Sequence, residues 1–363
     1  MEYLVADYYP HFVCKCGDCR SSCCHGWPVT ISKSEYLRLR EADCEPAYRQ
    51  KLDGAVNVSG YGADEKSYAH IVHDKFGNCR LLRQDGLCGL QLQLGEAILP
   101  DVCRLYPRNV RSAAGVPELA CAASCEAVVE KLLGSREPLG FTKLELPAPP
   151  RFQIQMTEAQ YARTRQAIRI LEDRSLPLPE RFQRLGAELF DLGGGEVDRA
   201  AALRLMHAVL DYYAGKSRVA GPICSEALRV LGVDDRQSLN DWEVEELEAR
   251  YAQAAAGARQ RRPSWDMDLE RLLVNHLFYN SFPHVGGTDD GANAFYGLCV
   301  TAAFMQLALF ACMTLRDTEE DAVDILSELS RLIEHSDFKY RAAAFYRQFS
   351  RDKQGVWQAL VSF

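Results

Sequence analysis

The residues of this chain best suited to do chemistry are cysteines, and they are concentrated near its beginning. Eleven of the fourteen cysteines fall within the first 125 residues. The densest motif is Cys14-x-Cys16-x2-Cys19-x3-Cys23-Cys24, which puts five thiols into eleven residues. Packing alone seldom requires that density, whereas zinc and iron–sulfur clusters prefer thiolate ligands. The spacing therefore predicts a metal or cluster site, with a plain zinc knuckle as the simpler alternative.

A second set of cysteines is widely spaced along the chain. Cys79 and Cys88 bracket the segment CRLLRQDGLC, Cys103 opens CRLYPR, and Cys121 and Cys125 close the series. Regular zinc ribbons use two close pairs, so isolated thiols of this kind can share a metal only after tertiary folding. Because a site takes about four ligands, eight or more thiols allow two sites, or one cluster beside a zinc.

The start of the chain favours reduced thiols over disulfides. Residues 1–14 carry no positive region, no long apolar run and no small-residue cleavage site of the secretory type. We therefore expect a cytoplasmic protein, and clustered cysteines in a reducing cytosol are more often metal ligands or redox groups than disulfide partners.

Composition narrows the class of protein further. The chain has 363 residues, 47% hydrophobic and 25% charged, which is ordinary for a globular protein of two domains. Its net charge of -8 disfavours binding to nucleic acid, which relies on clustered Lys and Arg. The uncharged stretch 291–315 is long enough to span a bilayer, but its polar residues predict a buried core helix and no membrane span.

The chain changes character near residue 135. Residues 1–135 are predicted to form a small irregular Cys-rich domain that binds a metal or an iron–sulfur cluster, with a helix begun by the capping box Ser32-x-x-Glu35 and two short strands within 53–74. Residues 136–150 read as a linker. Residues 151–363 are predicted to be an α-helical domain, which makes the fold mainly α. The Gly-rich segment 191–198 is predicted to end a helix, not to hold a cofactor.

Several segments together resemble a known family. FVCKCGDCRSSCCHGW, CRLLRQDGLC, LGE and CRLYPR are similar to the flagellin lysine N-methylase (FliB) family, which shares its cysteine-rich part with CxxCxxCC-type zinc- or iron-chelating proteins. The later segment LLVNHLFYNSFP, at 272–283, resembles the C-terminal signature of that family. The resemblance therefore touches both parts of the chain.

The resemblance implies a protein-lysine N-methyltransferase that modifies flagellin lysines with S-adenosylmethionine and carries a [4Fe-4S] cluster, with zinc instead of or beside the cluster as an alternative. The family pattern contains Ser-Cys-Pro-Glu where this chain has Ser-Cys-Glu, so Cys121 could replace Cys125. Cys16 and Cys44 are additional to the pattern. The metal ligands implied by position are Cys14, Cys19, Cys23, Cys24, Cys79, Cys88, Cys103 and Cys125.

The remaining site residues are less specific. Tyr106 and Arg108 are candidates to position the substrate amine or a cofactor carboxylate, since a guanidinium binds a carboxylate through two hydrogen bonds; Arg108 could equally offset the charge of a thiolate cluster. His25 is either a ligand or a local hydrogen-bonding group. Three further residues lie near one face of a predicted helix: Asn275, Tyr279 and Asn280. They either line a pocket or pack in the core with their amide groups hydrogen-bonded. No motif marks a site for S-adenosylmethionine.

Two functions from other classes remain alternatives. One is a noncatalytic iron–sulfur protein that transfers electrons, and the other is a zinc-stabilised interaction module whose N-terminal part unfolds when the metal is removed. A conventional radical enzyme is disfavoured, because Cys16-x2-Cys19-x3-Cys23 has the reverse of the spacing that such enzymes use.

Overall fold

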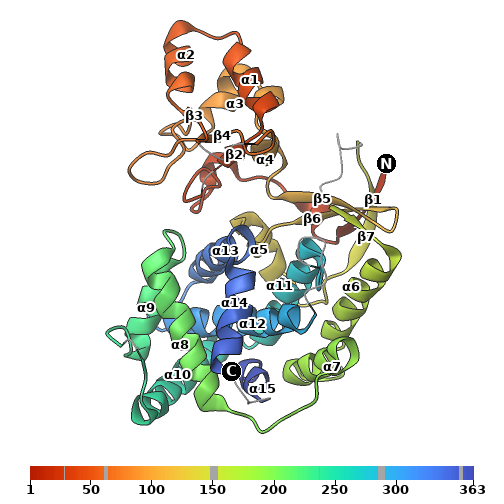
Figure 1. The fold of residues 1–363 in the computed structure, drawn as a ribbon, viewed down its shortest axis with the longest axis vertical. Coiled ribbons are helices and arrows are strands. Elements are labelled where there is room, and N and C mark those ends of the chain that lie inside the picture. Colours follow the sequence, from red (N-terminus) through yellow and green to blue (C-terminus); the bar gives the residue numbers. More distant parts are fainter. Residues whose placement is uncertain (28, 61–63, 148–153, 237, 285–290, 351–354) are drawn as a thin grey trace. The chain divides into compact units, whose positions relative to one another are not determined.

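The computed structural model describes residues 1–27, 29–60, 64–147, 154–236, 238–284, 291–350 and 355–363. These residues divide into two compact units (Figure 1). Unit 1 comprises Met1–Phe12 and Asn109–Phe363, and unit 2 comprises Val13–Arg108. The boundary differs from the predicted one, because the first strand and residues 109–135 belong to the larger unit.

A five-stranded sheet explains why the first residues join unit 1. Its order is β7-β1-β6-β5-β8. Strand β1 is parallel to β6, with Val5 opposite Leu119, and antiparallel to β7, with Val5 also opposite Thr142. The predicted linker 136–150 therefore contains a strand, β7, that is hydrogen-bonded to the start of the chain. The strands are β1 (Glu2–Ala6), β5 (Arg108–Ala113), β6 (Val116–Cys121), β7 (Phe141–Glu145) and β8 (Ile154–Met156).

Strands β5 and β6 are joined by a two-residue turn. Ala114 has φ of 51° and Gly115 has φ of 79°, the left-handed pair that tight hairpin turns require. Glycine adopts this conformation freely, whereas alanine is strained there by its Cβ atom.

Replacing Ala114 with asparagine is expected to stabilise unit 1. Asn-Gly is the favoured pair for such turns, so the free energy of unfolding should rise by about 0.5–1 kcal/mol. Urea unfolding followed by circular dichroism measures the change. The matched control is Ala256→Asn, on an exposed face of a helix, where asparagine should lower stability by about 0.5 kcal/mol. Equal effects at the two positions would contradict the turn assignment.

The fold is mainly α, as predicted. Capping boxes begin several helices, including those starting after Thr157, Asn240 and Thr318. The helices of unit 1 are α5 (Glu126–Leu133), α6 (Glu158–Leu171), α7 (Leu178–Phe190), α8 (Arg199–Lys216), α9 (Gly221–Leu231), α10 (Asp241–Arg261), α11 (Trp265–Asn280), α12 (Ala292–Cys312), α13 (Glu319–His335), α14 (Phe338–Phe349) and α15 (Val356–Leu360), with a 3-10 turn at Tyr9–His11.

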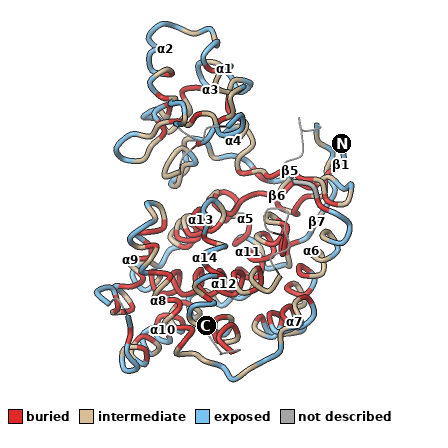
Figure 2. Tube along the Cα trace, in the orientation of Figure 1, coloured by how far each residue is buried: buried red, intermediate tan, exposed pale blue. Residues whose placement is uncertain are grey.

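Helix α12 is the core of unit 1. Every residue from Gly297 through Cys312 is buried, and α12 packs against α9, α10, α14 and α15 (Figure 2). Among the described residues it is the one helix long and apolar enough to span a membrane, but 94% of its apolar window is buried inside the protein. The prediction of a buried core helix is confirmed.

The Gly-rich segment 191–198 follows the end of α7. Asp191 takes the left-handed conformation with φ of 53°, and its N–H bonds to the Gly186 carbonyl oxygen. The prediction of a helix end is confirmed, although Asp191, not glycine, provides the left-handed residue.

Unit 2 is small and contains a three-stranded antiparallel sheet of order β2-β4-β3. Ser32 and Glu35 form the predicted capping box at the start of α1, and the two strands expected within 53–74 are β3 and β4. A small core forms around Ile31, Leu39 and Leu81. The elements are β2 (Val29–Ile31), α1 (Lys33–Glu41), α2 (Pro46–Asp53), β3 (Val56–Val58), β4 (Ala69–Ile71), α3 (Gly89–Leu94) and α4 (Asp101–Leu105), with 3-10 turns at Cys16–Asp18 and Glu96–Ile98.

Candidate functional site

Unit 2 contains seven of the eight cysteines predicted as metal ligands. Four of them come from the first loop and three from later segments, and all seven fall within Val13–Arg108. The eighth, Cys125, belongs to unit 1, where it is the N-cap residue of α5. Its role as a ligand, like the alternative at Cys121, stays a prediction.

Backbone hydrogen bonds hold the first cysteine loop against the second. The Cys79 N–H donates to the Cys24 carbonyl oxygen at 2.7 Å, and the Gly26 N–H donates to the Gly77 carbonyl oxygen at 3.0 Å. Beside these, His25 Nδ1 lies 3.0 Å from Asn78 Oδ1. His25 thus makes the local hydrogen bond that was one of its two predicted roles, with a residue 53 positions away in the chain.

Two glycines allow a second close approach between these loops. A Cβ atom on Gly17 would lie 2.8 Å from the Asp85 carbonyl oxygen, and one on Gly86 would lie 2.8 Å from the Gly17 carbonyl oxygen. Gly86 also has φ of 76°, a conformation that other residues rarely adopt. The loop between Cys16 and Cys19 therefore lies against the loop between Cys79 and Cys88.

The later cysteines sit in turns whose N–H groups face sulfur. The Leu81 N–H donates to Cys79 Sγ at 3.4 Å, and the Leu82 N–H also lowers the pKa of that thiol. At the start of α3, burial raises the pKa of Cys88, and the N–H groups of Gln91 and Leu90 offset part of that rise. Hydrogen bonds of this type stabilise a thiolate and tune a metal bound to it.

Five thiols influence one another's ionisation, and we call them the thiol cluster: Cys23, Cys24, Cys79, Cys88 and Cys103. A hydrogen bond from the Cys23 thiol lowers the pKa of Cys24 to about 7, and that shared proton is the main reason that the pKa of Cys23 is raised. Burial, with the charges of neighbouring cysteines, raises the pKa of Cys79 to about 11 and that of Cys103 further. A cation placed among these sulfurs would favour their thiolate forms.

The donor set fits a soft metal. All fourteen cysteines lie in the part of the chain that the structure describes, and none of them is in a disulfide. Within that same part, no three His, Cys, Asp or Glu side chains already close around one point in the manner of a metal site. The fold brings the cysteines of unit 2 near one another, and their side chains would have to rotate toward a bound metal to form a complete metal site.

Tyr106 is connected to the loop that carries Cys23. Its ring packs edge-on against Trp27, with centroids 5.1 Å apart, and Trp27 Nε1 donates to the Cys23 carbonyl oxygen at 3.0 Å. Arg108 is half-buried as the first residue of β5 and the last of unit 2. Their predicted roles toward substrate or cofactor stay predictions.

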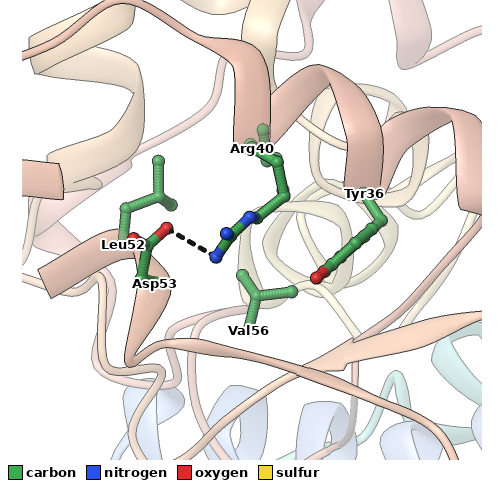
Figure 3. A pocket seen from close by; sticks show the side chains of 6 residues that line it. Tyr36, Arg40, Leu52, Asp53 and Val56 are labelled. Atoms are coloured by element: carbon green, nitrogen blue, oxygen red, sulfur yellow. Dashed lines mark ion pairs between the residues drawn. The ribbon is translucent and has the colours of Figure 1, made fainter. Parts of the chain in front are cut away.

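A separate hollow of unit 2 contains none of these thiols (Figure 3). It measures about 190 Å³ counting its open mouth and lies where α1 and α2 meet β3. The Arg40 guanidinium reaches across it to Asp53, at 3.2 Å, and Tyr36 and Val56 lie beside the pair. Because Arg40 and Asp53 already pair with each other, this hollow offers little to a ligand.

The helical trio of unit 1 divides between packing and a pocket. Asn275 is fully buried; its Oδ1 accepts from the Tyr8 hydroxyl at 2.8 Å, and its Nδ2 donates to the Cys121 carbonyl oxygen at 2.9 Å. Asn280 instead lines a hollow at the end of α11, together with residues of α12 and α14. Tyr279 does not line it, although its carbonyl oxygen accepts from Asn109 at 3.2 Å.

Asn275→Ala is expected to lower the free energy of unfolding by about 1–3 kcal/mol, because the Tyr8 hydroxyl and the Cys121 carbonyl would each lose a buried partner. Thermal or urea unfolding measures this loss. Asn280→Ala is the matched control and should cost less, since Asn280 is only half-buried and bonds within its own helix. If Asn275→Ala kept full stability but lost activity, the packing role would be wrong.

The hollow itself was missed from the sequence except for Asn280. Its polar side chains include Lys339 and Asn293, which lie in the first turns of α14 and α12. No local motif marks either residue, and only the packing of α12 against α14 brings them together. The one sequence feature that indicated this region was the segment 272–283, which resembles the C-terminal signature of the FliB family.

Comparisons with known proteins agree with the C-terminal half of this description. Residues 196–352 match the family described as the FliB lysine N-methylase C-terminal domain. The curated relatives include a lysine-N-methylase of Salmonella choleraesuis, 22% identical over 38% of this chain and 33% of that protein, and the same enzyme of Salmonella typhimurium at equal identity and coverage. The flagellar biosynthetic protein FliU of Salmonella muenchen is 23% identical over 36% of this chain and 77% of its own length. No solved structure matches.

These matches indicate a class first: residues 196–352, from α8 onward, are similar to the C-terminal domain of lysine N-methylases. The resemblance to the FliB family that was predicted from the sequence is confirmed over this segment, which is less than half of the chain. The match covers about a third of the length of the two lysine-N-methylases. The resemblance of the cysteine-rich segments still rests on their own motifs.

Proposed function

We propose that this protein is an S-adenosylmethionine-dependent lysine N-methyltransferase that modifies flagellin and carries an iron–sulfur cluster on unit 2. The observation that carries the proposal is the match of residues 196–352 to the FliB lysine N-methylase C-terminal domain. The names of its relatives, lysine-N-methylase and a flagellar biosynthetic protein, support lysine as the target and flagellin as the substrate.

The chemistry asks two things of the protein. A lysine amine has a usual pKa of about 10.4, so it must lose its proton before its lone pair can attack the methyl group on the sulfonium. The amine must also be held in line with that methyl group, because alignment of the reacting atoms supplies much of the rate. Tyr106 and Arg108 remain our candidates for positioning these groups.

The thiol cluster is the proposed place for the metal. Its five sulfurs, with Cys14 and Cys19 of the first loop, supply more than the about four thiolates that a [4Fe-4S] cluster takes. Bound there, the cluster would supply a structural clamp for unit 2 or a centre that accepts one electron. Zinc is the alternative occupant of the same sulfurs.

The test begins with anaerobic purification, analysis of iron, sulfide and zinc, and a visible spectrum. The protein is then incubated with S-adenosylmethionine and purified flagellin, and lysine methylation is read by peptide mass spectrometry. Iron and sulfide with methylated lysines support the proposal. Iron and sulfide without methyl transfer would indicate a noncatalytic cluster protein, and zinc alone without methyl transfer would indicate a structural interaction module.

A further inference from the structure

A hollow in unit 1 lies where α11 ends and α12 and α14 begin, and we call it the α14 hollow. It measures about 460 Å³ when the solvent space at its open mouth is counted. Every residue that lines it falls within 276–340, inside the segment matched to the FliB C-terminal domain.

The α14 hollow contains a half-buried cation. Lys339 lines it, and its Nζ lies 5.1 Å from the centre of the Tyr340 ring. Within the described ranges, no carboxylate lies at ion-pair distance from that Nζ; the nearby Asp337 bonds instead to Arg341 at 2.5 Å. Burial lowers the pKa of Lys339, which means that the protein pays free energy to keep this ammonium charged. An anion bound beside it would recover that energy.

A second donor follows from the hydrogen bonds of His276. Asn280 Nδ2 donates to both the His276 carbonyl oxygen and the ring Nδ1, each at 3.1 Å. The carbonyl can only accept, which fixes the orientation of the amide and makes Nδ1 an acceptor. Burial lowers the pKa of His276 to about 4, so near neutral pH the ring has one proton, on Nε2. His276 therefore offers an N–H donor.

The walls of the hollow complete this pattern. Phe282 and Leu298 supply apolar surface, and no carboxylate side chain is among the described residues that line the hollow. A cation, a neutral N–H donor and apolar walls suit a small ligand with one negative group and an apolar body.

We propose that the α14 hollow binds the carboxylate of the methyl donor, with Lys339 pairing with the carboxylate of its amino-acid portion. The inference rests on the proposed function for the identity of the ligand, and on the geometry of the hollow for the place. Lys339 is thereby a binding residue, and His276 is the second donor to the same group.

The test is isothermal titration of the whole protein with S-adenosylhomocysteine, which keeps the carboxylate and lacks the reactive methyl. The wild-type protein is expected to bind it and to bind methylthioadenosine, which lacks the carboxylate, much more weakly. Lys339→Met should weaken binding of S-adenosylhomocysteine about tenfold or more, and Lys339→Arg should retain most of it. Lys216→Met, the same change at an exposed position near the end of α8, is the matched control.

The stability of Lys339→Met separates binding from folding. Because the buried ammonium is unfavourable without an anion, the variant should melt at the wild-type temperature or above it while binding less tightly. Unchanged affinity for S-adenosylhomocysteine in Lys339→Met, or equal affinity for methylthioadenosine in the wild type, would overturn the assignment of the hollow. Binding of inorganic phosphate without any binding of S-adenosylhomocysteine would also overturn it.

The outcomes also keep the two proposals apart. Lys339-dependent binding without methylation of flagellin supports the hollow and contradicts the proposed reaction. Methylation by a Lys339→Met variant whose affinity is unchanged supports the reaction and contradicts the hollow.

Discussion

For the proposed iron–sulfur methylase, replacing Cys88 with serine is expected to remove most of the iron and sulfide and to lower flagellin methylation about tenfold or more. Serine keeps the shape of the side chain but supplies a hydroxyl, a poor ligand for a soft metal. The N–H groups of Leu90 and Gln91 that face the Cys88 sulfur would lose a thiolate acceptor at the same time. Metal analysis, the visible spectrum and the flagellin assay measure the two effects, and Cys23→Ser should behave in the same way.

Cys44→Ser is the matched control for this change. Cys44 lies in unit 2 and is partly exposed, but it belongs neither to the family pattern nor to the thiol cluster. The control should keep its iron and its activity. Retention of iron in both Cys23→Ser and Cys88→Ser would contradict the ligand assignment, and loss of iron in Cys44→Ser would enlarge the ligand set.

The cysteines of the helical core give a second control. Cys224, Cys299 and Cys312 are buried among apolar side chains, and burial raises the pKa of each thiol. Neutral buried thiols pack as small apolar groups. Alanine at these positions should therefore leave the metal content unchanged.

The second large effect is expected at the buried ion pair of the β5–β6 hairpin. Arg111 Nε lies 2.6 Å from Glu118 Oε2, and both side chains are almost fully buried. Glu118→Leu would leave the Arg111 charge without its partner, so the free energy of unfolding should fall by about 3–5 kcal/mol. Urea unfolding of the whole protein measures the loss.

The double variant Arg111→Met with Glu118→Leu sharpens this prediction. Apolar side chains of similar volume remove the buried charge altogether, so the double variant should be more stable than Glu118→Leu alone. Lys143→Met is the surface control, because the Lys143–Glu2 pair of the same sheet is exposed to solvent and should contribute little to stability. A loss at Glu118 no larger than the loss at Lys143 would show that the buried pair contributes nothing special.

Local signals in the sequence predicted the helical elements well. The capping box at Ser32, the uncharged run that became α12 and the end of α7 at Asp191 each depend on residues close together in the chain. The five-stranded sheet was missed, because β1 is only Glu2–Ala6 and its partner β6 lies more than a hundred residues away. A short-range sequence pattern cannot indicate which strands pair when they are that far apart in the chain.

The candidate site divides in the same way. Cysteine spacing identified the residue types in unit 2, whereas the approach of Gly17 to Gly86 and the N–H groups that face Cys79 appear only in the folded chain. Lys339 gave no sequence signal, because its surroundings come from α11 and α12. Residue types and their spacing could be predicted from the sequence, whereas contacts between distant segments could be seen only in the structure.

The position of β1 has a consequence for how the protein is made. Synthesis runs from the N-terminus, so β1 leaves the ribosome well before its neighbours β6 and β7, which emerge only after the whole of unit 2. During that interval both edges of β1 lack strand partners, and an unpaired strand is a template for association with other chains. Unit 2, continuous in sequence, can fold first and shorten the loop that must close to deliver β1 to its sheet. During synthesis, folding of the inserted unit 2 therefore competes with binding of β1 by chaperones or by other nascent chains.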